Sequence, residues 1–168
     1  ALENAEVSGI FNDAGGAQGS PSRLLSGILV ADPGEKIDAG ALIKWDLTMK
    51  MSGRILDGQL ALPYTTVTSN SNTSYDTGDD ESAGGAAVSL AVHELELGTA
   101  SALVLTVSEG DGSTWVQIAQ ATFSTETLGA YYVEVAGDIG THIKVAWAWT
   151  GGAGGGSTAR IVGGVARL

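Results

Sequence analysis

Short stretches that alternate apolar and polar residues recur along most of this chain, separated by turn signals about every ten residues. No window repeats its apolar residues with the 3.6-residue period and the end caps of a helix. Many short strands joined by turns bury their apolar sides by forming two packed antiparallel sheets. We therefore predict an all-β protein built as a single, jelly-roll-like β-sandwich. The predicted strands are Leu24–Val30, Ala41–Met51, Arg54–Tyr64, Ala87–His93, Ala102–Ser108, Trp115–Phe123, Tyr131–Ala136, Ile143–Thr150 and Arg160–Ala166.

Two segments lack a clear alternation. Residues 1–22 are rich in Gly, Ala, Ser and Asn, and we expect an irregular N-terminal arm with Ile10 and Phe11 as apolar anchors. Residues 65–85, TTVTSNSNTSYDTGDDESAGG, are polar, acidic and bounded by glycine. This composition predicts a long acidic loop, which would lie within a sandwich domain of residues 23–168.

The charge of the chain is unevenly distributed. The net charge is −11, and the stretch from Ile55 to Ile143 holds twelve Asp or Glu residues and not one Lys or Arg. Binding to nucleic acid or to anionic lipid depends on cations, so we expect neither partner. The basic residues near the two ends remain candidates for contact with acidic partners. Together with the two anchors, the candidate interaction residues are Ile10, Phe11, Arg23, Lys144, Arg160 and Arg167.

The chain contains no cysteine, which excludes disulfides, thiolate catalysis and cysteine-ligated metal centres. No apolar run approaches the roughly 18 residues that a membrane span needs. The N-terminal ALENAEVSG lacks the basic-then-apolar form of a signal peptide, so we expect a protein that is made and used without secretory export.

Residues that could support catalysis or bind metal are few. Asp76, Asp79, Asp80 and Glu81 offer oxygen ligands, but their spacing does not match a calcium-binding EF-hand loop, and solvated acidic turns are more common. The two histidines, His93 and His142, fall at strand ends and belong to no known catalytic motif. We therefore expect no enzyme activity, no metal and no cofactor.

The tryptophans admit two interpretations. Trp147 and Trp149 alternate on one side of a predicted strand with Ile143 and Val145, which favours a place in the core. Alternatively, the four tryptophans and nearby tyrosines could form a platform on which sugars stack. The opposite side of the same strand, Lys144-Ala146-Ala148, is almost flat. We expect it to lie beneath another sheet or against another subunit.

The C-terminal half, Gly84 to Leu168, resembles a domain that recurs in structural proteins of tailed bacteriophages. The resemblance follows the order of three segments: SAGGAAVSLAV, then ALVLTVSEGDGSTWVQIAQATF, then GAYYVEVAGDIGTHIKVAWAWTGGAGGGSTARIVGGVAR. The family typically carries basic residues just after the V-x-V-x-G turn, and here only Lys144 remains.

This resemblance implies a component of the virion, assembled in the host cytoplasm. The first hypothesis is a non-enzymatic capsid decoration (cement) protein on the outer surface of a phage head. Its partners would be the major capsid protein or another virion protein, and copies of itself, with a trimer favoured. The alternative is a receptor- or carbohydrate-binding module associated with a tail or fibre.

Overall fold

The computed structural model describes residues 6–11, 16–30, 49–51, 53–79, 81, 83–124, 129–152 and 155–168. Over these residues the chain forms eleven β-strands and no helix. The strands are β1 Glu6–Phe11, β2 Pro21–Val30, β3 Met49–Met51, β4 Ile55–Val67, β5 Ser71–Asp76, β6 Ala86–Glu96, β7 Ala102–Gly110, β8 Trp115–Phe123, β9 Gly129–Val135, β10 His142–Thr150 and β11 Thr158–Arg167.

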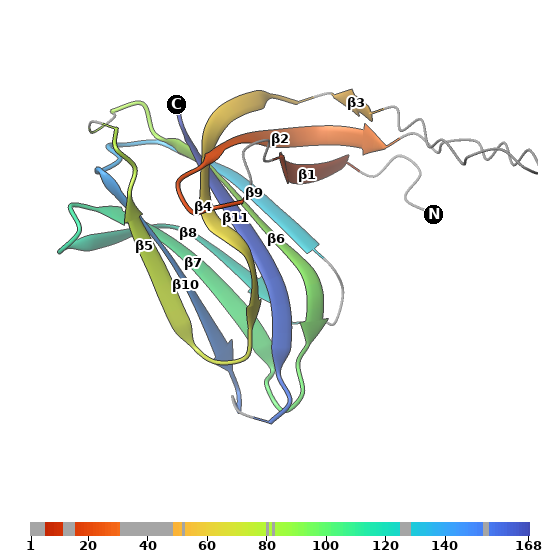
Figure 1. The fold of residues 1–168 in the computed structure, drawn as a ribbon. Helices are drawn as coiled ribbons and strands as arrows, with labels where there is room; N and C mark the ends of the chain where they lie inside the picture. Colours follow the sequence, from red (N-terminus) through yellow and green to blue (C-terminus); the bar gives the residue numbers. More distant parts are fainter. Residues whose placement is uncertain are drawn as a thin grey trace, which may run out of the picture.

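The strands form two antiparallel sheets that pack face to face (Figure 1). The seven-stranded sheet has the order β1-β2-β4-β11-β6-β9, with β3 also paired to β2, and the four-stranded sheet has the order β5-β10-β7-β8. The prediction of an all-β sandwich is confirmed. Strand β8 has the predicted bounds, whereas residues 41–48 of another predicted strand lie outside the described residues.

The pairing of strands β4 to β11 is nested, as in one long hairpin folded over on itself. Strand β7 pairs with β8, β6 with β9, β5 with β10, and β4 with β11, and successive pairs alternate between the two sheets. Eight strands in this order form a jelly roll. The tip of the long hairpin is the turn at Asp111-Gly112, where Gly112 has a φ of 91° that favours glycine.

The core lies between the two sheets and follows the two-residue period of the strands. From the four-stranded sheet, Leu103, Leu105 and Val145 are fully buried, and from the seven-stranded sheet Leu90 and Ile161 meet them. Burial of each such side chain contributes about 1.5–3 kcal/mol. Trp149 is only 4 % exposed and Trp147 packs against the same core, so the core interpretation of these two tryptophans is confirmed.

The expected irregular arm contains regular structure. Strand β1 lies within residues 1–22 and pairs with β2, which itself begins at Pro21. The two strands continue the seven-stranded sheet beyond β4 and form a ribbon. This ribbon curves over the outer side of β11, β6 and β9 and extends beyond the sandwich (Figure 1). There Leu24 is fully buried and clusters with Ala87 and Ala166. The prediction of an irregular arm is wrong at β1, because small residues on the sheet leave room for a docked strand.

The expected acidic loop at residues 65–85 is also wrong in part, since it contains the end of β4 and all of β5. Strand β5 forms a continuous ladder with β10, from Asp76 opposite His142 to Ser71 opposite Trp147. It lies at the edge of its sheet and pairs with β10 alone, and Tyr75 on its inner side packs against the core. A polar strand of this kind resembles a loop in composition.

The glycine-rich segment after β10 packs against the turn between β6 and β7 of the same chain. The amide of Thr99 donates to the carbonyl oxygen of Gly155, and the Thr99 hydroxyl donates to that of Gly152. A Cβ atom on Gly98 would collide with the Gly155 carbonyl oxygen. Glycine is therefore required at this contact because two backbones meet there.

Candidate functional site

No group of three or more His, Asp or Glu side chains in the described part of the chain is arranged to hold a metal ion. The two histidines lie on different sheets. His93 stacks edge-on against Tyr64 on the seven-stranded sheet, and His142 stacks edge-on against Trp115 on the four-stranded sheet. Asp76 accepts a hydrogen bond from the amide of Gly78, which closes a turn. These groups are held by local contacts and do not converge on one point.

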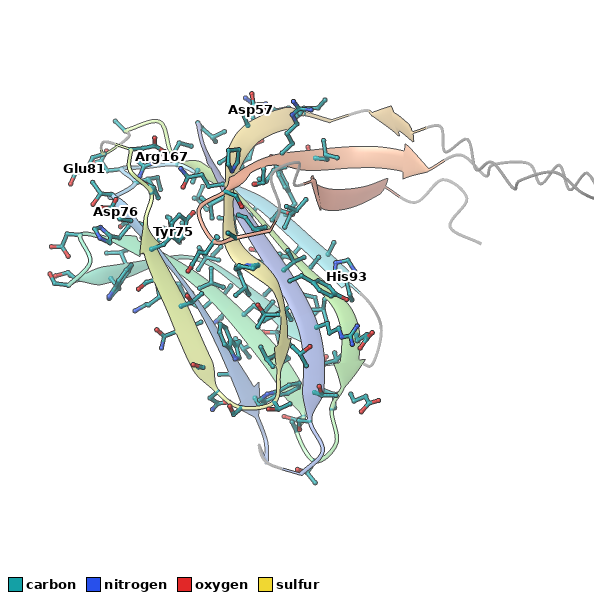
Figure 2. The ribbon with its side chains drawn as sticks, in the orientation of Figure 1. Asp57, Tyr75, Asp76, Glu81, His93 and Arg167 are labelled. Atoms are coloured by element: carbon teal, nitrogen blue, oxygen red, sulfur yellow. The ribbon has the colours of Figure 1, made fainter. Side chains whose placement is uncertain are left out.

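A small cavity opens at the end of the sandwich where β4 and β5 meet β11 (Figure 2). Its volume is about 90 Å³, and Arg167 forms one wall. The guanidinium of Arg167 donates to the carbonyl oxygens of Ile139 and Gly140 and to the Thr77 hydroxyl, at 2.7–3.2 Å. It also lies 3.9 Å from a carboxylate oxygen of Asp79. Arg167 therefore ties the last strand to two loops.

Two polar atoms in this cavity have no hydrogen-bond partner, the hydroxyl of Tyr75 and the side-chain carbonyl oxygen of Gln59. Burial raises the pKa of Tyr75 above its ordinary value, so the hydroxyl keeps its proton over the physiological range. At the density of liquid water the cavity has room for about three water molecules. Its size and its mixed lining suit solvent rather than a substrate.

The seven-stranded sheet is rich in paired charges. Exposed ion pairs join Arg23 to Asp57 at 3.6 Å, Arg54 to Glu134 at 3.1 Å and Arg160 to Glu94 at 3.1 Å. The hydrogen bond to Tyr64 and the carboxylate of Glu94 both raise the pKa of Arg160.

Part of the outer side of the seven-stranded sheet lies under the ribbon, and we call that part the covered face. The sheet residues that the ribbon covers there are Ala87, Ser89, Gly164 and Ala166.

The outer side of the four-stranded sheet has a different character, and we call it the open face. Its side chains are mostly small or neutral polar groups. Asp76 and Lys144 carry its only formal charges among the described residues. The open face comprises Asn72, Ser74, Asp76, Val104, Thr106, Ser108, Trp115, Gln117, Gln120, Thr122, His142, Lys144, Ala146 and Ala148.

Trp115 is the one large aromatic side chain on the open face. The ammonium group of Lys144 lies 4.4 Å from the centroid of its ring, in a cation–π contact, and His142 packs against it at 6.5 Å between ring centroids. The ring lies beside Gly110, where a Cβ atom would press against it. Trp115 is thus fixed at one end of the open face.

The candidate interaction residues from the sequence do not gather on one surface. Ile10 belongs to the ribbon and lies against Gly164 of the sheet. Phe11 pairs with Arg23 through the backbone, and the side chain of Phe11 lies outside the described residues. Arg160 lies on the outer side of the seven-stranded sheet, and Arg167 is held inside the cavity wall. Lys144 alone lies on the open face.

Sequence reasoning missed the open face as a unit, although it contained one signal. The flat side Lys144-Ala146-Ala148 was expected to lie beneath a sheet or against a subunit, and among the described residues no sheet covers it. The partners of these residues on β7, Ser108, Thr106 and Val104, could be identified only once the register was known.

No protein-family model matches the chain. A search of curated proteins also finds no match. The described residues include no helix long and apolar enough to cross a membrane.

Proposed function

We propose that this protein is a non-enzymatic structural component of a virion, a decoration (cement) protein that assembles in several copies on the outer surface of a tailed-phage head. The observation that carries the proposal is the open face on a jelly-roll sandwich. Depletion of charged groups at the centre of a surface is typical of protein–protein interfaces, and in the part of the open face that the structure describes only Asp76 and Lys144 are charged. Jelly rolls serve as capsid and lectin domains.

Two further features support the proposal. The resemblance of residues 84–168 to phage structural proteins indicates a virion component, and decoration needs complementary surfaces but no chemistry. The net charge of −11 suits a position outside the capsid, away from packaged DNA. The ribbon of β1 and β2, which extends beyond the sandwich, offers a second contact surface (Figure 1). A protein that binds the head through both the open face and the ribbon attaches more strongly than through either surface alone.

The proposal is tested on particles. Purified virions are analysed by mass spectrometry, and heads that lack the protein are incubated with it, sedimented and imaged by electron cryomicroscopy. We expect the chain in the virion, co-sedimentation with heads, and new density on their outer surface. Absence of the chain from virions together with no binding to heads would contradict the proposal.

The second candidate function is a carbohydrate- or receptor-binding module of a tail or fibre. The observation that favours it is Trp115, which lies among the amides Gln117 and Gln120 on the open face. Aromatic rings and amide side chains are common in ligand sites. This function predicts that the fluorescence of Trp115 shifts when glycans are added, and that Trp115→Ala abolishes the shift. A titration without any shift would exclude it.

A further inference from the structure

We propose that two copies of this chain pair through their open faces, in a contact that places Ala146 and Thr106 near its centre. The inference rests on the proposed function only in taking the protein to act in several copies. The pairing is isologous, since each copy contributes the same surface. It therefore predicts a two-fold dimer, in place of the trimer favoured from the sequence.

The shape of the open face suits close contact. Its two central strands present Ala146, Ala148 and Thr106 outward, and these small side chains leave the sheet nearly flat; Ser108 beside them is buried. On the other sheet, residues of the same size form the floor of the covered face, and the ribbon is docked there with Leu24 fully buried. The chain thus covers one flat sheet face with its own ribbon, while the described residues leave the other uncovered.

The distribution of charge decides which partner fits. Two copies that each carry −11 repel one another unless they meet where carboxylates are scarce. The open face meets this condition, since Asp76 is its only described carboxylate and lies on the edge strand β5. Lys144 on the adjacent strand has the opposite charge. The described part of the open face therefore carries no net formal charge, and two copies can approach each other there with little repulsion.

The area of the open face lies near the lower limit for a specific pair, which is about 1,000 Å² in total over both partners. Four strands about 4.8 Å apart, with residues rising about 3.4 Å each, give β10 and its neighbours a face of about 19 Å by 30 Å. This corresponds to roughly 570 Å² in projection, and the relief of the side chains adds to it. A standard interface buries about 800 Å² on each partner.

A second copy fits the open face better than a glycan does. Sugars stack on the face of an aromatic ring, and the ammonium group of Lys144 already lies over the face of Trp115, 4.4 Å from the ring centroid. The remaining groups are hydroxyls and amides, which pair readily with the same groups on a second copy, directly or through water. We therefore assign the open face to self-association.

The test compares matched variants in sedimentation velocity over a series of protein concentrations. Ala146→Glu places a carboxylate at the centre of the open face, and Gln120→Glu adds a charge there without changing the size of the side chain. Ala130→Glu is the control, because Ala130 is exposed on β9 of the other sheet. Circular dichroism and thermal melts establish that each variant is folded.

We expect a dimer for the wild type and for Ala130→Glu. Ala146→Glu should weaken dimerisation at least about 100-fold, because like charges meet across the axis, and Gln120→Glu should weaken it about 10-fold. A wild type that stays monomeric at 200 µM, or a dimer or trimer that Ala146→Glu leaves intact, overturns the inference. A monomer whose Trp115 fluorescence responds to glycans overturns it in favour of glycan binding. Binding to heads is measured separately, so the proposed function can fail while the dimer stands, or the reverse.

Discussion

The outer sides of the two sheets carry similar small residues but differ in what packs against them. On the covered face, Ala87 and Ala166 lie beneath the ribbon with the buried Leu24. On the open face, Ala146 and Ala148 stay at the surface, half-exposed. The seven-stranded sheet also carries three exposed ion pairs, whereas the open face carries one lysine and one aspartate. A flat sheet side of small residues can pack closely against another segment. On the covered face that segment belongs to the same chain, and on the open face we propose that it belongs to a second copy.

The two faces should differ most in the free energy of unfolding that is lost when a large side chain is replaced by alanine. Leu24→Ala removes a fully buried side chain from beneath the ribbon and should lower the free energy of unfolding by about 2–5 kcal/mol. Val104→Ala, on the half-exposed open face, should lower it by less than about 1 kcal/mol in the monomer. Urea unfolding measures both values. Equal losses would mean that the ribbon does not cover the sheet as described.

A smaller difference is expected when a side chain is enlarged. A Cβ atom on Gly164 would lie 3.1 Å from a methyl group of Leu24 and 3.4 Å from one of Ile10, so Gly164→Val should cost about 1–3 kcal/mol through overpacking. Ala148→Val makes a comparable addition on the open face, where solvent leaves room, and should change stability by less than about 0.5 kcal/mol. Thermal melts of the two variants at low protein concentration test this contrast. A neutral Gly164→Val would contradict the tight packing under the ribbon.

The ion pairs should contribute least. A double-mutant cycle of Arg160→Ala and Glu94→Ala should give a coupling energy far below the loss expected for Leu24→Ala, because the pair is exposed to solvent. Added salt should reduce this coupling. A coupling energy as large as the loss from Leu24→Ala, or one that does not respond to salt, would mean that the charged sheet side is more buried than the structure shows.

The sequence predicted strands with apolar residues and a strong turn signal more reliably than it predicted polar strands. Strand β8 was found at its observed bounds because it alternates clearly and follows a strong Asp111-Gly112 turn signal. Strand β5 was taken for a loop, since its residues are polar apart from Tyr75, the one β5 side chain that packs against the core. Strand β1 was missed because its stability depends on the docking of the ribbon.

The candidate surfaces depend on register, which a single sequence does not contain. The flat side Lys144-Ala146-Ala148 could be recognised from β10 alone, but the open face emerges only when Thr106 and Gln120 are aligned beside it. Arg167 was expected to be available for a partner, and its sequence position gives no sign that Ile139, Gly140 and Thr77 surround it. Those contacts join residues that lie far apart in the chain.

Labelling of single cysteines distinguishes whether the open face or the outer side of the seven-stranded sheet meets a second copy. Because the chain has no cysteine, single variants report accessibility without background. The rate of maleimide labelling is measured for Ala146→Cys and Ala130→Cys at 1 µM and at 200 µM protein, under reducing pretreatment. We expect labelling at position 146 to slow at least about tenfold at the higher concentration and labelling at position 130 to stay unchanged. Equal rates at both concentrations for both variants would contradict this expectation.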